Sequence, residues 1–311
     1  MIRPLYLALI AALLPAAAVA FDLQGHRGAR GLAPENTLAG FVRALEVGVS
    51  TLELDTVVTK DNVVVVSHDP TLNPNITRDA AGRFIEPPGP AIRATTLAEL
   101  RRYDVGRLRP GTRYAQTYPD QRAVDGERIP TLAEVFALVR ARGADVRFNI
   151  ETKITPQQPD LAPEPEAFVK LLLAEIDRAG LRARVTLQSF DWRTLEAAQR
   201  LAPGLPTAYL SAQQSWLNNV PGPGSVPARV AAAGGPIWSP FFGDLTPESL
   251  AEARTLGLKV IVWTVNAPAD IERMLDWKVD GIISDRPDIV RDALARRAMP
   301  LPRRYGASSG G

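Results

Sequence analysis

Short apolar runs alternate with amphipathic segments along most of the chain, and this alternation restricts the fold more than any other feature. TLAEVFALVRARG at 131–143 precedes VRFNIETK at 146–153, and PESLAEARTLG at 247–257 precedes LKVIVWTVN at 258–266. Strands interleaved with amphipathic helices are typical of a parallel sheet in the α/β class. Because many such units follow one another without a GxGxxG turn, we expect a closed TIM-type (β/α)8 barrel.

The chain contains nine candidate strands, one more than such a barrel holds. TLELDTVV at 51–58 and VVVVSHD at 63–69 are joined only by a few residues around Lys60, Asp61 and Asn62. Parallel neighbours need a crossover connection of about a dozen residues or more. This pair is therefore predicted to form an antiparallel hairpin that shares one barrel position.

Two stretches interrupt the alternation. Residues 70–128 contain Pro- and Gly-rich turns, an arginine-rich patch and one expected short helix at Thr96–Arg102, so we interpret them as an insertion. Residues 211–235 include PGPGSVP and predict a long loop. The barrel is expected to occupy residues 21–298, followed by a disordered tail at 299–311.

The first twenty residues, MIRPLYLALIAALLPAAAVA, have the pattern of a secretory signal peptide. Arg3 gives a positive start, an apolar run follows, and the small residues up to Ala20 predict cleavage there. Retention as a membrane anchor is the alternative, but Pro15 interrupts a run that is short for a span of about 20 residues. We therefore expect a periplasmic or secreted protein with no stable membrane span after cleavage.

The composition agrees with one large packed domain. Apolar residues make up 46% of the chain and charged residues 23%, which is typical of a globular protein with a large core. There is no cysteine, so packing rather than disulfide bonds must hold the mature chain together. A formal charge of +2 gives no reason to expect nucleic acid as a partner, and no sequence feature specifies an oligomeric state.

The only two histidines of the chain, His26 and His68, each follow a predicted strand. Barrel enzymes place their catalytic groups at this end of the strands. Between them, Glu53 and Asp55 are two positions apart and therefore share one face of a strand. With a two-residue hairpin loop, position 68 would lie opposite position 55, or opposite 53 after a slip of two, so we expect His68 beside the acids.

Glu151 supplies a third acid at the end of another predicted strand. Buried carboxylates this close repel one another unless a cation or proton lies between them, which favours a metal site over a pair of exposed acids. Three oxygen ligands without cysteine suit one divalent cation, Ca²⁺ or Mg²⁺. Lys153 shares the face of Glu151 and is either its structural ion-pair partner or a cation for an anionic substrate.

Nine short motifs complete the pattern. HRG, PENT, ELD, TKD, VVSHDP, NIETK, LQSF, WTVN and DGIISDRP occur in this order between Gly25 and Pro287. Together they resemble the glycerophosphodiester phosphodiesterase family, in its secreted or periplasmic bacterial form. The resemblance implies that the insertion at 70–128 lies over the C-terminal face of the barrel and helps to define the substrate site.

The resemblance also implies roles for individual residues. Glu53, Asp55 and Glu151 would bind the divalent cation, and His26 and His68 would act as general acid and base. The remaining implied roles are phosphate binding by Arg27 and Lys153, bracing of the site by Glu35 and Asn36, and lining of the pocket by Gln188, Trp263 and Asn266. Trp263 could equally belong to the barrel core.

The implied reaction is metal-dependent hydrolysis of a small glycerophosphodiester to glycerol 3-phosphate and an alcohol. Similar enzymes are thought to use the neighbouring glycerol hydroxyl as an internal nucleophile. Two alternatives remain open at this point. One is a lipid-acting barrel similar to sphingomyelinase D or lysophospholipase D, and the other is a barrel that binds glycerophosphodiesters without catalysis.

Overall fold

The structure, a computed structural model, describes residues 21–154, 156–213 and 222–306. The predicted signal peptide at residues 1–20 lies outside the described residues. The strands are β1 (Asp22–Gly25), β2 (Thr51–Val58), β3 (Val64–Val66), β4 (Arg147–Thr152), β5 (Val185–Ser189), β6 (Thr207–Ser211), β7 (Ile237–Pro240), β8 (Lys259–Val262) and β9 (Gly281–Ser284).

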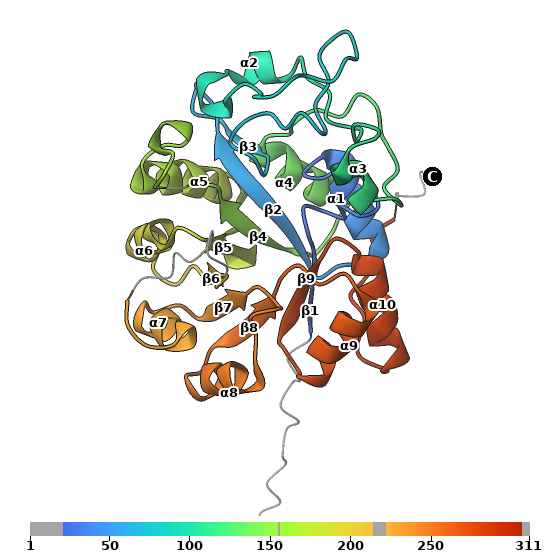
Figure 1. The fold of residues 1–311 in the computed structure, drawn as a ribbon. Helices are drawn as coiled ribbons and strands as arrows, with labels where there is room; N and C mark the ends of the chain where they lie inside the picture. Colours follow the sequence, from blue (N-terminus) through green and yellow to red (C-terminus); the bar gives the residue numbers. More distant parts are fainter. Residues whose placement is uncertain (1–20, 155, 214–221, 307–311) are drawn as a thin grey trace, which may run out of the picture.

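Helices cover the outside of these strands (Figure 1). The α-helices are α1 (Leu38–Val47), α2 (Leu97–Leu100), α3 (Arg113–Thr117), α4 (Leu132–Ala141), α5 (Pro165–Ala179), α6 (Trp192–Leu201), α7 (Val226–Ala232), α8 (Pro247–Thr255), α9 (Pro268–Asp276) and α10 (Pro287–Arg296). The described residues also form the short 3-10 helices η1 (Ile92–Ala94), η2 (Pro159–Leu161) and η3 (Arg182–Arg184).

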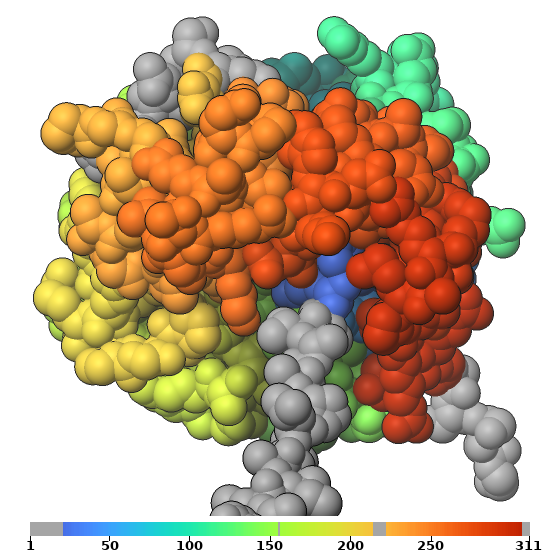
Figure 2. Space-filling view, turned by 90° about the horizontal axis from the view of Figure 1, so that it is seen from below, coloured from blue at the N-terminus to red at the C-terminus, as the bar shows by residue number. Residues whose placement is uncertain are grey.

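The strands form one closed parallel barrel, as the alternation predicted. Their order is β1-β9-β8-β7-β6-β5-β4-β2, and pairing of β1 with β2 closes the ring. Figure 2, a view from below, shows the later segments arranged in chain order from yellow-green to red around the blue start of the described chain. Pairing of β1 with β9 brings the two ends of the barrel sequence side by side, with Gly25 opposite Ser284.

The ninth strand forms the predicted hairpin, because β3 pairs antiparallel with β2. The predicted register was wrong by one residue: Thr56 pairs with Val66, and Ser67 N donates to Asp55 O at 3.0 Å. The cause is a three-residue loop, 60–62, in which Asn62 takes a left-handed conformation with φ 59°. His68 therefore lies beyond the end of β3 and reaches the barrel mouth from a loop.

Side-chain alternation separates two layers of packing. On β2, Leu52 and Leu54 point outward into the large core between barrel and helices, whereas Glu53 and Asp55 point to the barrel interior. The interior itself has two unlike halves. Polar residues from β1, β2, β4 and β5 occupy one half, and an apolar cluster from β6 to β9 occupies the other: Ala208, Ile237, Ile261 and Ile283.

Local sequence signals fix the ends of several helices. Thr131 and Glu134 form a capping box at the start of α4, and Thr96 and Glu99 form another at the start of α2. Among the described residues, no helix combines the length and apolarity needed to cross a membrane.

The insertion builds a small core of its own against the hairpin. Val57 of β2 and Val65 of β3 pack with Ile129, which directly follows the insertion, and with residues of the insertion itself: Leu72, Ile92, Leu100 and Val105. Figure 1 shows these segments, in cyan to green, beside the ends of β2 and β3. The insertion also contains α3, a helix that the sequence pattern did not indicate, and Gln121 Nε2 donates to Arg30 O at 2.7 Å in the loop after β1.

Two expectations about irregular segments differ from the structure. Residues 211–235 contain α7, which begins after the cap Ser225 with Pro227 in its first turn. Residues 299–306 of the tail that was expected to be disordered have a defined position, and residues 307–311 lie outside the described residues. Tyr305 is 8% exposed and belongs to the main core, and its N–H donates to Leu45 O near the end of α1 at 2.9 Å.

We predict that Tyr305→Ala lowers the free energy of unfolding by about 2 kcal/mol, because it removes a buried aromatic ring. Leu301→Ala, at a position that is 43% exposed in the same segment, should cost less than about 0.5 kcal/mol. Urea denaturation of both variants checks this. Equal, small effects would mean that the segment does not pack on the barrel in solution.

Candidate active site

A cavity of about 960 Å³ opens at the carboxyl ends of the barrel strands. Its lining divides into a charged side and an apolar side. The charged side comes from the ends of the first strands and comprises His26, Arg27, Glu53, His68, Glu151 and Lys153. The apolar side includes Phe190, which follows β5, and Trp263, which follows β8. The cavity lies where (β/α)8 enzymes carry out their chemistry.

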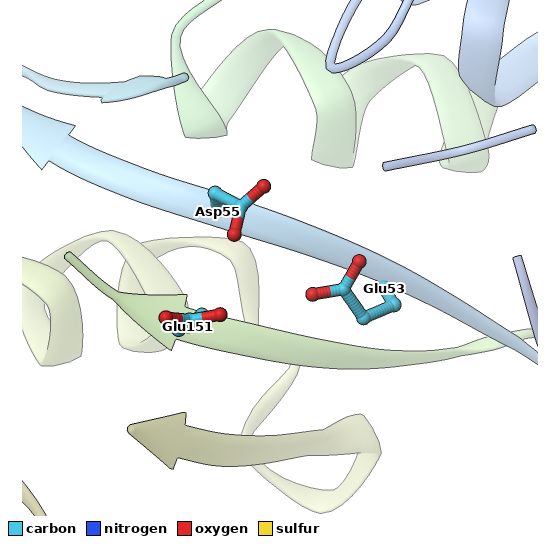
Figure 3. A group of neighbouring side chains, drawn as sticks. All are labelled: Glu53, Asp55 and Glu151. Atoms are coloured by element: carbon cyan, nitrogen blue, oxygen red, sulfur yellow. The ribbon is translucent and has the colours of Figure 1, made fainter. Parts of the chain in front are cut away.

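Three buried carboxylates meet at the charged side. Figure 3 shows Glu53 and Asp55 on β2 and Glu151 near the end of the neighbouring strand β4. One oxygen of each lies within 4.8 Å of the others, and their exposed fractions are 1%, 0% and 6%. The parallel register places Asp55 directly opposite Glu151, so the backbone pairing brings the acids together.

Burial and mutual repulsion separate the titration of the three acids. Burial raises the pKa of Glu53 well above its ordinary value, and the negative charges of Asp55 and Glu151 raise it further. Burial also raises the pKa of Glu151 to about 7, although Lys153 opposes this. For Asp55, Lys153 and Arg27 outweigh the effect of burial and hold the pKa well below its usual range.

Two cations already contact this cluster. Lys153 Nζ lies 2.7 Å from Glu151 Oε1 and 3.1 Å from Asp55 Oδ1. Arg27 Nε lies 3.2 Å from Asp55 Oδ2, but the same guanidinium is also paired with Glu35. The charge of Arg27 is balanced by Glu35. The three ionised carboxylates of the cluster and the ammonium group of Lys153 then have a net charge of two negative units.

The residues fit a divalent cation of the hard type. Two uncompensated negative charges equal the charge of one Ca²⁺ or Mg²⁺ ion, and all three candidate ligands are carboxylates. Asp55 Oδ1 is buried and accepts no hydrogen bond, and its charged neighbour is Lys153 Nζ at 3.1 Å, so this oxygen still has a lone pair for a cation. Glu53, Asp55 and Glu151 are therefore a set of ligands that could hold such an ion.

His26 is oriented by an acid from the last strand. Its Nδ1 lies 2.6 Å from Asp285 Oδ1, and its Nε2 points toward the acid cluster, 3.9 Å from Glu53 Oε2. Arg30 Nε donates to Asp285 Oδ1, and Asn266 Nδ2 donates to Asp285 Oδ2, at 2.8 Å each. Asp285 was not predicted from the sequence. It lies opposite His26 because β1 and β9 are neighbouring strands, and each of the two residues directly follows its strand.

His68 has a comparable but more exposed arrangement. Its Nδ1 lies 2.8 Å from Asp69 Oδ1, and Asn73 Nδ2 donates to the other oxygen of Asp69 at 2.7 Å. Burial lowers the pKa of both histidines to about 4, with a further contribution from Arg30 at His26 and from Arg27 at His68. Both imidazoles are therefore neutral at neutral pH and keep Nε2 for another partner.

Arg27 is held by groups from three parts of the chain. It has a left-handed backbone with φ 51°, and its N–H donates to Glu53 Oε2 at 2.8 Å. Its Nη1 donates to Glu35 Oε1 at 2.8 Å, and the hydroxyl of Tyr114, from the insertion, donates to the other oxygen of Glu35. Asn36 Nδ2 donates to Asp55 Oδ2 at 2.9 Å. Glu35 and Asn36 thus contact the residues that they were expected to brace.

The three expected pocket residues lie in different places. Gln188 lines the cavity, and its amide donates to Glu53 Oε1 at 2.6 Å. Trp263 lines the cavity and also packs on the apolar interior cluster. It is therefore both a pocket residue and part of the barrel core. Asn266 lies behind Asp285 and contacts that carboxylate instead.

Sequence reasoning missed Asp285, Asp69, Arg30 and Tyr114. The motifs SHDP and DGIISDRP contain the two aspartates: Asp285 directly follows β9, and Asp69 lies shortly beyond the end of β3. A systematic search for acids after strand ends would have found them. Tyr114 lies in the insertion and has no comparable sequence signal.

The barrel and its cavity define a (β/α)8 enzyme in which carboxylates, histidines and cations surround one site. The sequence pattern of the glycerophosphoryl diester phosphodiesterase family matches residues 26–289. The glycerophosphodiester phosphodiesterase of Caldanaerobacter subterraneus subsp. tengcongensis is 33% identical over 263 residues, which cover 85% of this chain and 93% of that protein. The chain therefore belongs to the glycerophosphoryl diester phosphodiesterase family and has the enzymatic activity of that family.

Solved structures share this fold. A crystal structure from Silicibacter pomeroyi DSS-3 has a TM-score of 0.84 and 39% identity, covering 90% of this chain and 95% of that chain. A phosphodiesterase from Oleispira antarctica, in complex with the product sn-glycerol-3-phosphate, shares the fold at a TM-score of 0.69 and 23% identity. The matched region covers 88% of this chain and 96% of the Oleispira antarctica chain.

The raised pKa of Glu151 predicts how pH affects the cation-free protein. A carboxyl group whose folded pKa is about 7, against an ordinary 4.5, binds more protons in the folded state. The contribution of Glu151 to the free energy of unfolding is therefore fully present below about pH 4.5 and is lost as pH rises through about 7. A divalent cation should offset the cost of the buried negative charge that Glu151 carries at high pH. Adding Ca²⁺ or Mg²⁺ after chelation should therefore raise Tm by about 5 °C more at about pH 8 than at about pH 5.

Glu151→Gln provides the control for this measurement, because an amide does not titrate in this range. Its Tm after chelation should vary less with pH than that of the unmodified protein. Differential scanning calorimetry of both proteins checks the prediction. The same cation-induced shift at both pH values would contradict the proposed link between the acids and the cation.

Proposed function

We propose that the chain hydrolyses glycerophosphodiesters to glycerol 3-phosphate and an alcohol, with one divalent cation, Ca²⁺ or Mg²⁺, and with His26 and His68 as general acid and base. The observation that carries the proposal is the convergence of both histidines with Glu53 and Glu151 on one cavity, where Asp55 lies within 4.8 Å of the two glutamates. The sn-glycerol-3-phosphate in the Oleispira antarctica phosphodiesterase supports a product of this size and charge.

The cations of the cavity suit an anionic substrate. A phosphodiester carries one negative charge, which repels an attacking oxygen unless positive groups offset it. Arg27 and Lys153 both line the cavity, and each is already fixed by a carboxylate: Glu35 at 2.8 Å and Glu151 at 2.7 Å. Pre-formed positions of this kind bind and orient the phosphate without a reorganisation cost. A divalent cation at the three acids would offset further phosphate charge and help to activate the nucleophile.

The two histidines supply the proton transfers. One neutral imidazole takes at Nε2 the proton of the glycerol hydroxyl beside the phosphate while that oxygen bonds to phosphorus. The other, protonated once the anionic phosphate is bound, gives a proton to the leaving alkoxide as its P–O bond breaks. The resulting cyclic phosphate is then opened by water, with the two proton transfers reversed, to give glycerol 3-phosphate. Asp285 and Asp69, at 2.6 and 2.8 Å from the Nδ1 atoms, hold the rings in position and stabilise the charged forms.

Glycerophosphocholine is the substrate that tests the proposal. The purified protein should release choline and glycerol 3-phosphate, lose this activity in the presence of a chelator and regain it with Ca²⁺ or Mg²⁺. Enzymatic assays for choline and for glycerol 3-phosphate measure both products. Absence of turnover with every cation would refute the proposed reaction, and release of phosphocholine would place the cleavage on the other side of phosphorus.

The histidine roles are tested by single substitutions. His26→Ala and His68→Ala should each lower kcat at least about 100-fold, because each removes one proton transfer. Asp285→Asn should lower kcat with little change in KM, because it keeps the shape of the side chain but removes the charge that stabilises imidazolium. Steady-state kinetics, with circular dichroism as the folding control, measure these effects. Near-normal kcat in either histidine variant would rule out its assigned role.

A further inference from the structure

The insertion places two tyrosines behind the arginines of the loop that follows β1. Tyr114 lies in α3, and Tyr118 is the residue at which this helix ends. Their rings meet edge to face, with centroids 5.3 Å apart. Neither tyrosine lines the cavity that the described residues form. Any effect that they have on the reaction must therefore pass through other side chains.

Tyr114 is linked to Arg27 through the carboxylate of Glu35. One oxygen of Glu35 accepts from Arg27 Nη1 at 2.8 Å, and the other accepts from the hydroxyl of Tyr114. Burial raises the pKa of Tyr114, and the negative charge of Glu35 raises it further, so the hydroxyl keeps its proton and stays a donor. A carboxylate with both oxygens free binds a guanidinium through two parallel bonds. Tyr114 therefore limits Glu35 to one bond and leaves part of the Arg27 guanidinium to the cavity.

Tyr118 is linked to His26 through Arg30 and Asp285. The guanidinium carbon of Arg30 lies over the Tyr118 ring, 4.7 Å from its centroid, which is close enough for a cation–π interaction. The same guanidinium donates to both oxygens of Asp285, from Nε at 2.8 Å and from Nη2 at 3.1 Å. Asp285 in turn contacts Nδ1 of His26 at 2.6 Å. The ring of Tyr118 thus supports the arginine that orients the partner of the histidine.

The segment after α3 is attached to both strands that precede these groups. Gln121 Nε2 donates to Arg30 O at 2.7 Å in the loop after β1. Asp120 Oδ2 pairs with Arg286 Nη1 at 2.6 Å in the loop after β9. These contacts hold the tyrosines at the side of the barrel where the two arginines lie.

We propose that Tyr114 and Tyr118 are positioning residues of the reaction: Tyr114 sets the affinity for the phosphate through Arg27, and Tyr118 sets the rate of proton transfer through His26. The inference rests on the proposed function, in which Arg27 binds the phosphate and His26 transfers a proton. It adds two residues of the insertion to the site and gives each of them a separate effect. The bonds made and broken in the reaction are unchanged, because neither tyrosine touches the reacting atoms.

Tyr114→Phe removes only the hydroxyl. Glu35 is then free to bind Arg27 with both oxygens and to draw it away from the phosphate, so KM for glycerophosphocholine should rise about tenfold while kcat stays within about twofold. Isothermal titration calorimetry should show a similar loss of affinity for glycerol 3-phosphate, a measurement that needs no turnover. An unchanged KM together with an unchanged dissociation constant would overturn the role of Tyr114.

Tyr118→Leu keeps an apolar side chain but removes the ring beneath Arg30. The value of kcat should fall about fivefold, while KM and the affinity for glycerol 3-phosphate stay within about twofold. Tyr118→Phe keeps the ring and should have a kcat within about twofold of that of the unmodified protein. A normal kcat in Tyr118→Leu, or an equal loss in Tyr118→Phe, would overturn the role of Tyr118.

Tyr103→Phe is the matched control, because Tyr103 packs on the small core of the insertion and should change none of these constants. Thermal unfolding followed by circular dichroism shows whether each variant is folded. The same changes of kcat and KM in Tyr114→Phe and Tyr118→Leu would mean that each substitution only loosens the insertion, and would overturn the proposal. If the unmodified protein does not turn over glycerophosphocholine, the proposed function fails together with the role of Tyr118. The calorimetric comparison then still decides the role of Tyr114.

Discussion

The close approach of three buried carboxylates is the constraint on which the rest of this site depends. Glu53, Asp55 and Glu151 are brought within 4.8 Å by the parallel pairing of β2 with β4. Such a cluster is unfavourable by itself, because burial and mutual repulsion both oppose ionisation. Lys153 offsets part of this cost at 2.7 Å from Glu151, and a divalent cation would offset the remainder. The proposed cation would therefore stabilise the fold as well as serve the reaction.

Closure of the barrel completes the site around this cluster. Because β1 pairs with β9, Asp285 lies beside His26 although 259 residues separate them. The insertion contributes Tyr114, which holds Glu35 and through it the guanidinium of Arg27. The later strands carry apolar residues instead. The interior of the barrel is therefore divided into a polar half and an apolar half.

The parts of the fold and site that could be predicted are those encoded in local periodicity. Alternation of strands and helices predicted the barrel, and the spacing of Glu53 and Asp55 predicted their common face. The position of His68 depended on a single residue, since Asn62 adopts a left-handed conformation that shifts the hairpin register by one. Asp285 required knowledge of which strands become neighbours, and Tyr305 required knowledge of tertiary packing. Neither follows from spacing along the chain.

Calorimetric titration of Ca²⁺ and Mg²⁺ into the chelator-treated protein tests the central claim most directly. We predict one bound cation per chain, with more protons released at about pH 6 than at about pH 8, because Glu151 has a pKa of about 7 and must ionise to act as a ligand. Asp55→Asn should abolish the binding heat. Binding that survives this substitution, or no binding in the unmodified protein, would contradict the assignment of Glu53, Asp55 and Glu151 as the cation site.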